Sequence, residues 1–200
     1  MSSFLLMSKA KLTMAPKIYV LTGPSASGKS TIMNELANRG HITIPETARR
    51  ILNQHPEMGA SARQDLMFNE QATLERALHH CHPSQSIFLD RALPDYAAFS
   101  AHIHPHLTHT YAALASIATG AYTGVFFITT SIHLPGEETP FDKDSNDGIY
   151  RVEQSPTEAM NIAHEIETLY IAGGKTPKYI KWGPPRKRAD CIEALIYNEI

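Results

Sequence analysis

The chain has 200 residues, of which 42% are hydrophobic and 19% are charged, and its formal net charge is −2 at pH 7. This length and apolar content predict a flexible tail over 1–16 and one compact domain over 17–200. The weak net charge gives no global basic field, so no nucleic-acid partner is expected.

Short apolar runs alternate with helical patterns along the whole domain. Gly40 ends the first helical pattern, and Pro45 stops the second apolar run. Ser155 and Glu158 form a capping box that opens the sixth helical pattern. In chain order we expect a strand at 17–22, a helix at 29–37, a strand at 42–44, helices at 48–54 and 62–80, a strand at 86–90, helices at 94–102 and 107–119, a strand at 125–130, a helix at 155–172, a strand at 178–182 and a helix at 189–198.

One connection is unusually long. The stretch 133–147 is polar and rich in turn-forming residues, and it exceeds the length of an ordinary connection. It therefore predicts either a mobile lid over about 133–151 or a disordered segment.

Strands that alternate with helices indicate βαβ units and a parallel sheet that helices cover on both faces. Ligands of such sheets bind at the carboxyl ends of the strands. Gly23, Glu46, Asp90 and Thr130 all stand where an expected strand ends. Functional side chains are therefore expected at this edge.

The sequence GPSASGKS, 23–30, fills every fixed position of the phosphate-binding pattern G-x-x-x-x-G-K-[ST]. A loop that wraps a phosphate chain turns its N–H groups inward, which requires backbone angles that glycine tolerates best. Lys29 is expected to bridge the β- and γ-phosphates, and the Ser30 hydroxyl to ligate Mg²⁺. The expected ligand is a nucleoside triphosphate, ATP or GTP, with Mg²⁺. Its predicted contacts are Gly23, Pro24, Ser25, Ala26, Ser27, Gly28, Lys29, Ser30 and Thr31.

The predicted fold is therefore an α/β P-loop NTPase fold of three layers, with a five-stranded parallel sheet, helices on both faces and a lid. The guanine-reading N-K-x-D element and the D-x-x-G sequence are absent from the chain, which disfavours a Ras-like GTPase. A length of 200 residues leaves little room for the arginine-finger domain of a ring-forming ATPase. Small kinases remain, and they need a metal-holding acid, a group that orients the acceptor, several arginines and a lid.

The chain offers a candidate for each of these needs. Asp90 follows an apolar strand and is a candidate metal-holding acid beside Ser30, with a helix N-cap as the alternative role. Glu46 is a candidate base for an acceptor hydroxyl, or else an acid favoured by a helix dipole. One of Arg49 and Arg50 is expected to face the cleft. Arg151 follows the lid and would neutralise phosphate charge, unless it is a solvated surface arginine.

Several of these motifs together resemble one known family. The stretches GPSASGKS, IPETARRI, FLDRALPD and DGIYR, with Phe68, Gln71 and Glu75 on one predicted helix, resemble the NadR/TTD-type family of AAA-labelled P-loop proteins. That family is related to ribosylnicotinamide kinase and other nucleoside-kinase-like enzymes. The resemblance runs from 18 to about 195, and two features depart from it, Ala92 and the order Tyr150-Arg151. It implies ATP, Mg²⁺ and phosphoryl transfer to a small acceptor. It also implies that the residues matching the family motifs take part in function, namely Glu46, Arg49, Asp90, Arg91 and Asp95.

The sequence thus predicts a cytoplasmic kinase that phosphorylates a small, nucleoside-like hydroxyl compound. An NTP-hydrolysing regulatory switch with a protein or lipid partner is the alternative, because it would use the same loop. A nucleotide-binding module without catalysis is disfavoured by the intact Lys29, Ser30 and Asp90. The predicted catalytic residues are Lys29, Glu46, Asp90, Arg91 and Arg151; the acceptor contacts are Glu46, Arg49, Arg91 and Asp95; and the Mg²⁺ ligands are Ser30 and Asp90.

The remaining features carry weaker signals. No apolar run approaches the roughly 18 residues of a membrane span, and Cys81 and Cys191 lack metal-site spacing and are expected to be buried thiols. The histidines within 79–82 and 102–109 favour a polar loop over a metal site, because Pro105 interrupts the second group. The basic stretch 184–190 predicts a helix-entry loop near the nucleotide base rather than a nucleic-acid surface. Trp182 either lines that base pocket or packs against the protein.

Overall fold

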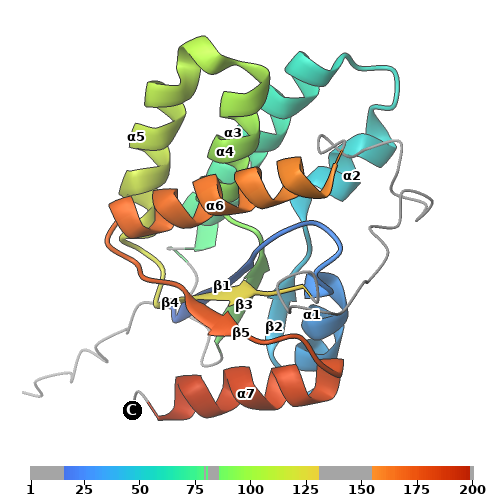
Figure 1. The fold of residues 1–200 in the computed structure, drawn as a ribbon, viewed down its shortest axis with the longest axis vertical. Helices are drawn as coiled ribbons and strands as arrows, with labels where there is room; N and C mark the ends of the chain where they lie inside the picture. Colours follow the sequence, from blue (N-terminus) through green and yellow to red (C-terminus); the bar gives the residue numbers. More distant parts are fainter. Residues whose placement is uncertain (1–15, 79, 81–85, 131–154, 199–200) are drawn as a thin grey trace, which may run out of the picture.

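A computed structural model describes residues 16–78, 80, 86–130 and 155–198 (Figure 1). Its strands form one five-stranded sheet in the order β2-β3-β1-β4-β5, and every neighbouring pair is parallel. This confirms the predicted α/β P-loop fold. The strands are β1 (Ile18–Thr22), β2 (Ile42–Ile44), β3 (Ile87–Asp90), β4 (Gly124–Ile128) and β5 (Lys178–Ile180).

Helices cover both faces of the sheet, as a parallel sheet requires. On one face α1 packs against α7, and on the other face lie α3, α4 and α6 (Figure 1). Helix α5 packs against α4 and α6, and α2 packs against α3. The helices are α1 (Lys29–Asn38), α2 (Thr47–Gln54), α3 (Ala60–Leu78), α4 (Leu93–Ile103), α5 (Thr108–Thr119), α6 (Pro156–Ala172) and α7 (Pro185–Tyr197), with a short 3-10 helix η1 (Pro105–Leu107).

The hydrophobic core divides at the sheet because successive residues of a strand face opposite sides. Tyr19 and Leu21 of β1 share a buried cluster with the apolar stripes of α1 and α7. Ile18 and Val20 share another cluster with α6. A further cluster around Ile51 joins α2 to the helical layer above the sheet. The central strand is thus packed on both sides, which fixes the position of the loop that follows it.

The order of the strands brings the expected functional edge together. Strand β3 lies between β1 and β2, and Leu21 of β1 is in register with Asp90 of β3. Parallel strands end at the same edge of a sheet, so the segments after β1, β2 and β3 are neighbours. These are the segments that carry Gly23, Glu46 and Arg91.

Four sequence predictions are wrong in detail. Helix α7 begins at Pro185 rather than at 189, because proline suits the first helical position, so the basic stretch lies in its first turn instead of an entry loop. Strands β4 and β5 end at Ile128 and Ile180, earlier than predicted. Cys191 is exposed rather than buried, since the apolar stripe of α7 that faces the sheet does not include it.

Part of the prediction lies outside the described residues. This holds for the lid at 133–151 with Arg151, for Cys81, and for His79 and His82. The division into a tail and one domain stays a prediction. Across 16–78, 80, 86–130 and 155–198, no helix has the length and apolar character to span a membrane, and no three His, Cys, Asp or Glu side chains are grouped to hold a metal.

Candidate active site

The connection from β1 to α1 has the backbone of an anion-binding loop. Gly23, Ala26 and Gly28 adopt positive φ angles of 124°, 59° and 82°. A Cβ on Gly23 would lie 2.5 Å from the backbone oxygen of Ile128, so glycine is required there. Gly28 is the N-cap of α1. Left-handed residues followed by a helix N-terminus favour binding of phosphate oxygens by backbone N–H groups.

Lys29 folds over this loop. Its Nζ donates to the carbonyl oxygens of Gly23 at 3.1 Å and Pro24 at 2.8 Å, and to Ser27 Oγ at 3.3 Å. The residue is 6% exposed. Burial lowers the pKa of Lys29 to about 8, and the nearby positive charge of Arg91 adds to this lowering. A buried cation whose hydrogen bonds among the described residues all go to neutral oxygens attracts a phosphate chain.

Ser30 and Asp90 meet beside the loop. The Ser30 hydroxyl donates to Asp90 Oδ2 at 2.9 Å, while Asp90 Oδ1 is buried without a hydrogen-bond partner among the described residues. Burial raises the pKa of Asp90, and Lys29 opposes this rise. Hydroxyl and carboxylate oxygens are ligands that Mg²⁺ accepts, directly or through its water shell. The structure therefore brings the two predicted Mg²⁺ ligands together, and the unpartnered oxygen fits such an ion.

Arg91 connects three segments at the edge of the sheet. Its Nε donates to Glu46 Oε1 at 2.9 Å, and its Nη1 donates to Asp95 Oδ1 at 2.9 Å and to the Gly23 oxygen at 3.3 Å. The guanidinium carbon lies 5.1 Å from the ring centre of Phe99. Arg91 has a φ of 69°, a strained conformation for a non-glycine residue that these contacts hold in place. Arg91 thus ties the start of α2 and of α4 to the phosphate loop.

Asp95 holds the guanidinium of Arg91 from the buried side of the site. It is fully buried and also accepts hydrogen bonds from the Thr22 hydroxyl at 2.7 Å and the Tyr170 hydroxyl at 2.6 Å. In this arrangement the carboxylate of Asp95 positions Arg91 and does not face solvent. Its predicted contact with an acceptor stays a prediction.

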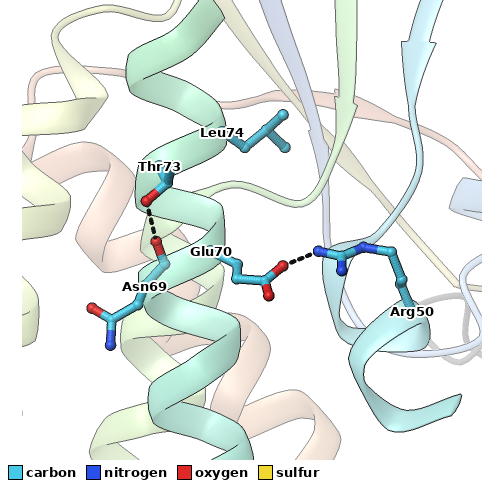
Figure 2. A pocket seen from close by; sticks show the side chains of 5 residues that line it. All are labelled: Arg50, Asn69, Glu70, Thr73 and Leu74. Carbon is cyan, nitrogen blue, oxygen red and sulfur yellow. Dashed lines mark hydrogen bonds and ion pairs between the residues drawn. The ribbon is translucent and has the colours of Figure 1, made fainter. Parts of the chain in front are cut away.

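The two arginines after Glu46 go to different places. Arg49 Nε lies 3.6 Å from Glu46 Oε2. Arg50 instead forms an ion pair with Glu70 of α3, across a surface hollow of about 380 Å³ that Thr73 and Leu74 also line (Figure 2). Arg49 is therefore the arginine of this pair that stands beside the candidate base.

Sequence reasoning missed Arg188. This side chain is 4% exposed, and its Nη1 donates to the Ser27 carbonyl oxygen of the phosphate loop at 2.7 Å. Its guanidinium carbon lies 5.1 Å from the ring centre of Trp182. One signal was present, because Arg188 precedes the buried Ile192 and Ile196 at intervals of four residues and so belongs to the buried stripe of α7.

Sequence reasoning gave Glu75 no role of its own, yet it is the centre of a buried network. Its Oε1 accepts from the Leu93 N–H and from Gln71 Nε2, both at 2.9 Å, and its Oε2 accepts from the Tyr122 hydroxyl at 2.6 Å. Burial raises the pKa of Glu75 to about 7. Gln71 also accepts from the Thr47 hydroxyl at 2.6 Å. The network joins α3 to the segments that carry Glu46 and Arg91.

This loop and its surroundings define a P-loop protein, and the P-loop fold implies nucleotide binding. The chain belongs to the AAA domain family, whose model matches residues 18–183. This confirms the resemblance that the motifs carry. No relative matches among curated proteins.

Solved structures share the fold at low sequence identity. The NadR protein in complex with NR is 15% identical with a TM-score of 0.65, and the match covers 92% of this chain and 52% of that chain. Deoxyadenosine kinase from M. mycoides with dCMP and dCDP is 13% identical with a TM-score of 0.59, over 92% of this chain and 100% of that one. Thymidylate kinase from Ehrlichia chaffeensis is 9% identical, with a TM-score of 0.59 and coverage of 92% and 100%. These identities show a common fold alone.

Proposed function

We propose that this protein is a kinase that uses ATP and Mg²⁺ to phosphorylate a hydroxyl group of a small, nucleoside-like molecule. The position of Glu46 carries the proposal. Asp90 pairs with Ser30, whereas Glu46 pairs with Arg91, which also contacts the phosphate loop. Two carboxylates with different partners at one loop support two roles, one toward a metal ion and one toward an acceptor.

Each side chain then has a task. Lys29 and the N–H groups of the loop bind the β- and γ-phosphates, so that the phosphates replace the carbonyl groups that now hold Lys29. Ser30 and Asp90 would hold Mg²⁺, which shields phosphate charge when bound. Glu46 orients the acceptor hydroxyl and accepts its proton.

Positive charge near the transferred phosphoryl group comes from arginines. Arg91 lies between Glu46 and the loop, and Arg49 lies on the other side of the Glu46 carboxylate. We assign Arg151, at the end of the proposed lid, to the same task. Asp95 serves this site by holding Arg91, and its contact with the acceptor is part of the proposal.

A nucleoside-like acceptor is supported by the shared fold of deoxyadenosine kinase, thymidylate kinase and the NadR protein in complex with NR. The donor is ATP in this proposal, and GTP is the alternative donor. Neither assignment follows from the loop alone, since its backbone groups contact phosphates and not the base.

A screen for acceptor-dependent consumption of ATP and GTP tests the proposal. The full chain is incubated with Mg²⁺, each triphosphate and a library of nucleosides and small alcohols. We expect turnover that depends on one class of acceptor, with a phosphorylated product found by mass spectrometry. Turnover that no acceptor changes would contradict a kinase.

Glu46→Gln provides the second measurement. Loss of a general base lowers transfer by roughly 10²- to 10⁴-fold, while triphosphate affinity stays near the wild-type value. Glu57→Gln is the matched control, because Glu57 is an exposed carboxylate in the connection after α2. Equal transfer rates in the two variants would remove Glu46 from the mechanism.

The alternative function is a regulatory switch that hydrolyses a nucleoside triphosphate and binds a protein or lipid partner. The basic stretch 184–190 would be the surface that contacts such a partner. Arg188 is buried against the phosphate loop, so it adds nothing to an exposed basic surface. The same screen decides, because a switch hydrolyses the nucleotide without an acceptor.

A further inference from the structure

The first turn of α7 places one arginine directly against the phosphate loop. Arg188 is 4% exposed and donates from Nη1 to the Ser27 carbonyl oxygen at 2.7 Å. Its guanidinium lies 5.1 Å from the ring centre of Trp182, within the range of a cation–π contact. Its Nε has no hydrogen-bond partner among the described residues. The hydrogen bond to the Ser27 carbonyl thus links this buried guanidinium directly to the backbone of the phosphate loop.

Because the peptide bond is planar, the contact of Arg188 with the Ser27 carbonyl also determines the direction of the Gly28 N–H. The carbonyl of Ser27 and the N–H of Gly28 belong to one trans peptide, so they point in opposite directions. An arginine that fixes the direction of the Ser27 carbonyl therefore also fixes the Gly28 N–H in the opposite direction. Inward N–H groups are the ones that bind phosphate oxygens.

Gly28 and Arg188 also fit each other sterically. A Cβ on Gly28 would lie 2.5 Å from Arg188 Nη2. The φ of 82° at Gly28 is a second reason for glycine at this position. The absence of a side chain thus lets the guanidinium lie directly against the loop.

We infer that Arg188 is a positioning residue of the phosphate loop, which holds the Ser27–Gly28 peptide with its N–H turned toward the triphosphate. Trp182 keeps the guanidinium in place through its ring. The inference rests on triphosphate binding within the proposed function and does not depend on the acceptor.

Binding measurements on Arg188→Ala test the inference, with ATP and inorganic tripolyphosphate as separate probes. Tripolyphosphate occupies the loop but has no base, so it isolates the phosphate contacts. We expect both affinities to fall roughly ten- to hundredfold, the effect of a misplaced hydrogen bond to a charged group. Arg186→Ala is the matched control, because it removes the same charge from an exposed position in the same turn.

Free guanidinium ion supplies a readout that a structural role would not change. Added at millimolar concentration, it should restore part of the affinity of Arg188→Ala for tripolyphosphate. Wild-type affinity in Arg188→Ala, a loss for ATP alone, or an equal loss in Arg186→Ala would each overturn the inference. A loss for ATP alone would indicate a contact with the base.

Folding of the variants is followed by thermal unfolding. If Arg188→Ala does not fold, Arg188→Lys is used instead, since it keeps the charge but lacks the planar fork. We expect Arg188→Lys to bind tripolyphosphate less tightly than the wild type, and wild-type affinity would again overturn the inference. If the wild-type chain binds neither probe, the proposed function fails together with this inference, whereas a normal Arg188→Ala variant overturns the inference alone.

Discussion

Replacing Glu75 by Gln tests the buried network that supports the active-site edge. Glu75 is 5% exposed, and its carboxylate accepts three hydrogen bonds, from Gln71, Leu93 and Tyr122. Burial raises the pKa of Glu75 from 4.5 to about 7, the hydrogen bonds oppose this rise, and the charge of Asp95 adds to it. The ionisable groups that face Glu75 are thus Tyr122 and Asp95. Glutamine has nearly the same shape and cannot ionise.

The magnitude follows from the difference between the two pKa values. The unfolded chain loses this proton near pH 4.5 and the folded protein near pH 7. At about 1.36 kcal/mol per pKa unit, the difference amounts to about 3 kcal/mol. Because the folded pKa is the higher one, this stabilisation is complete below pH 4.5 and is lost as the pH rises to 7.

Urea unfolding of the wild type and Glu75→Gln, at several pH values from about 4.5 to 7.5, measures this effect. The difference between their free energies of unfolding should change by about 3 kcal/mol over this range, to the disadvantage of the wild type at higher pH. Glu57→Gln, at an exposed position, should follow the wild type. If the difference between the free energies of unfolding of wild type and Glu75→Gln does not change with pH, the raised pKa of a buried Glu75 carboxyl is refuted.

Two further substitutions test the phosphate loop. Lys29→Met should lower triphosphate affinity, measured by calorimetry, roughly a hundredfold, because charge-assisted hydrogen bonds are lost. The loop should keep its shape, because the Gly23 carbonyl also accepts from Arg91 and the Pro24 carbonyl from the Ser27 N–H. Unchanged affinity would contradict the assignment of this loop to phosphate binding. Asp90→Asn should weaken Mg²⁺-dependent nucleotide binding by roughly 10- to 100-fold and leave metal-free binding unchanged. A Mg²⁺ titration at fixed nucleotide concentration measures this, and a wild-type titration curve would remove Asp90 from the metal site.

Local sequence signals predicted most of the fold. Buried parallel strands appear as short continuous apolar runs, and the five runs in this chain correspond to β1 to β5. Gly23 and Gly28, which the phosphate pattern requires, both adopt positive φ angles. The short distance between Ser30 and Asp90 depends on the pairing of β1 with β3, which the structure shows and no local pattern in the sequence encodes.

The missed residues have contacts that no local pattern encodes. Arg188 contacts Ser27 across 161 residues of sequence, and the Tyr122 hydroxyl reaches Glu75 across 47. Charged side chains are rarely buried, so a polar residue in an amphipathic pattern predicts exposure. The exceptions here, Arg188 and Glu75, receive hydrogen-bond partners that only the folded chain brings near. The start of α7 was missed for a different reason, because Pro184 and Pro185 suggest a loop although the second of them suits a first helical turn.

Two arginine side chains, Arg91 and Arg188, donate hydrogen bonds to carbonyl oxygens of the phosphate loop, at Gly23 and Ser27. The backbone of the loop therefore loses its freedom when the protein folds and not when a nucleotide arrives. A triphosphate therefore binds to a loop whose backbone is already ordered, and binding needs no slow ordering of the polypeptide.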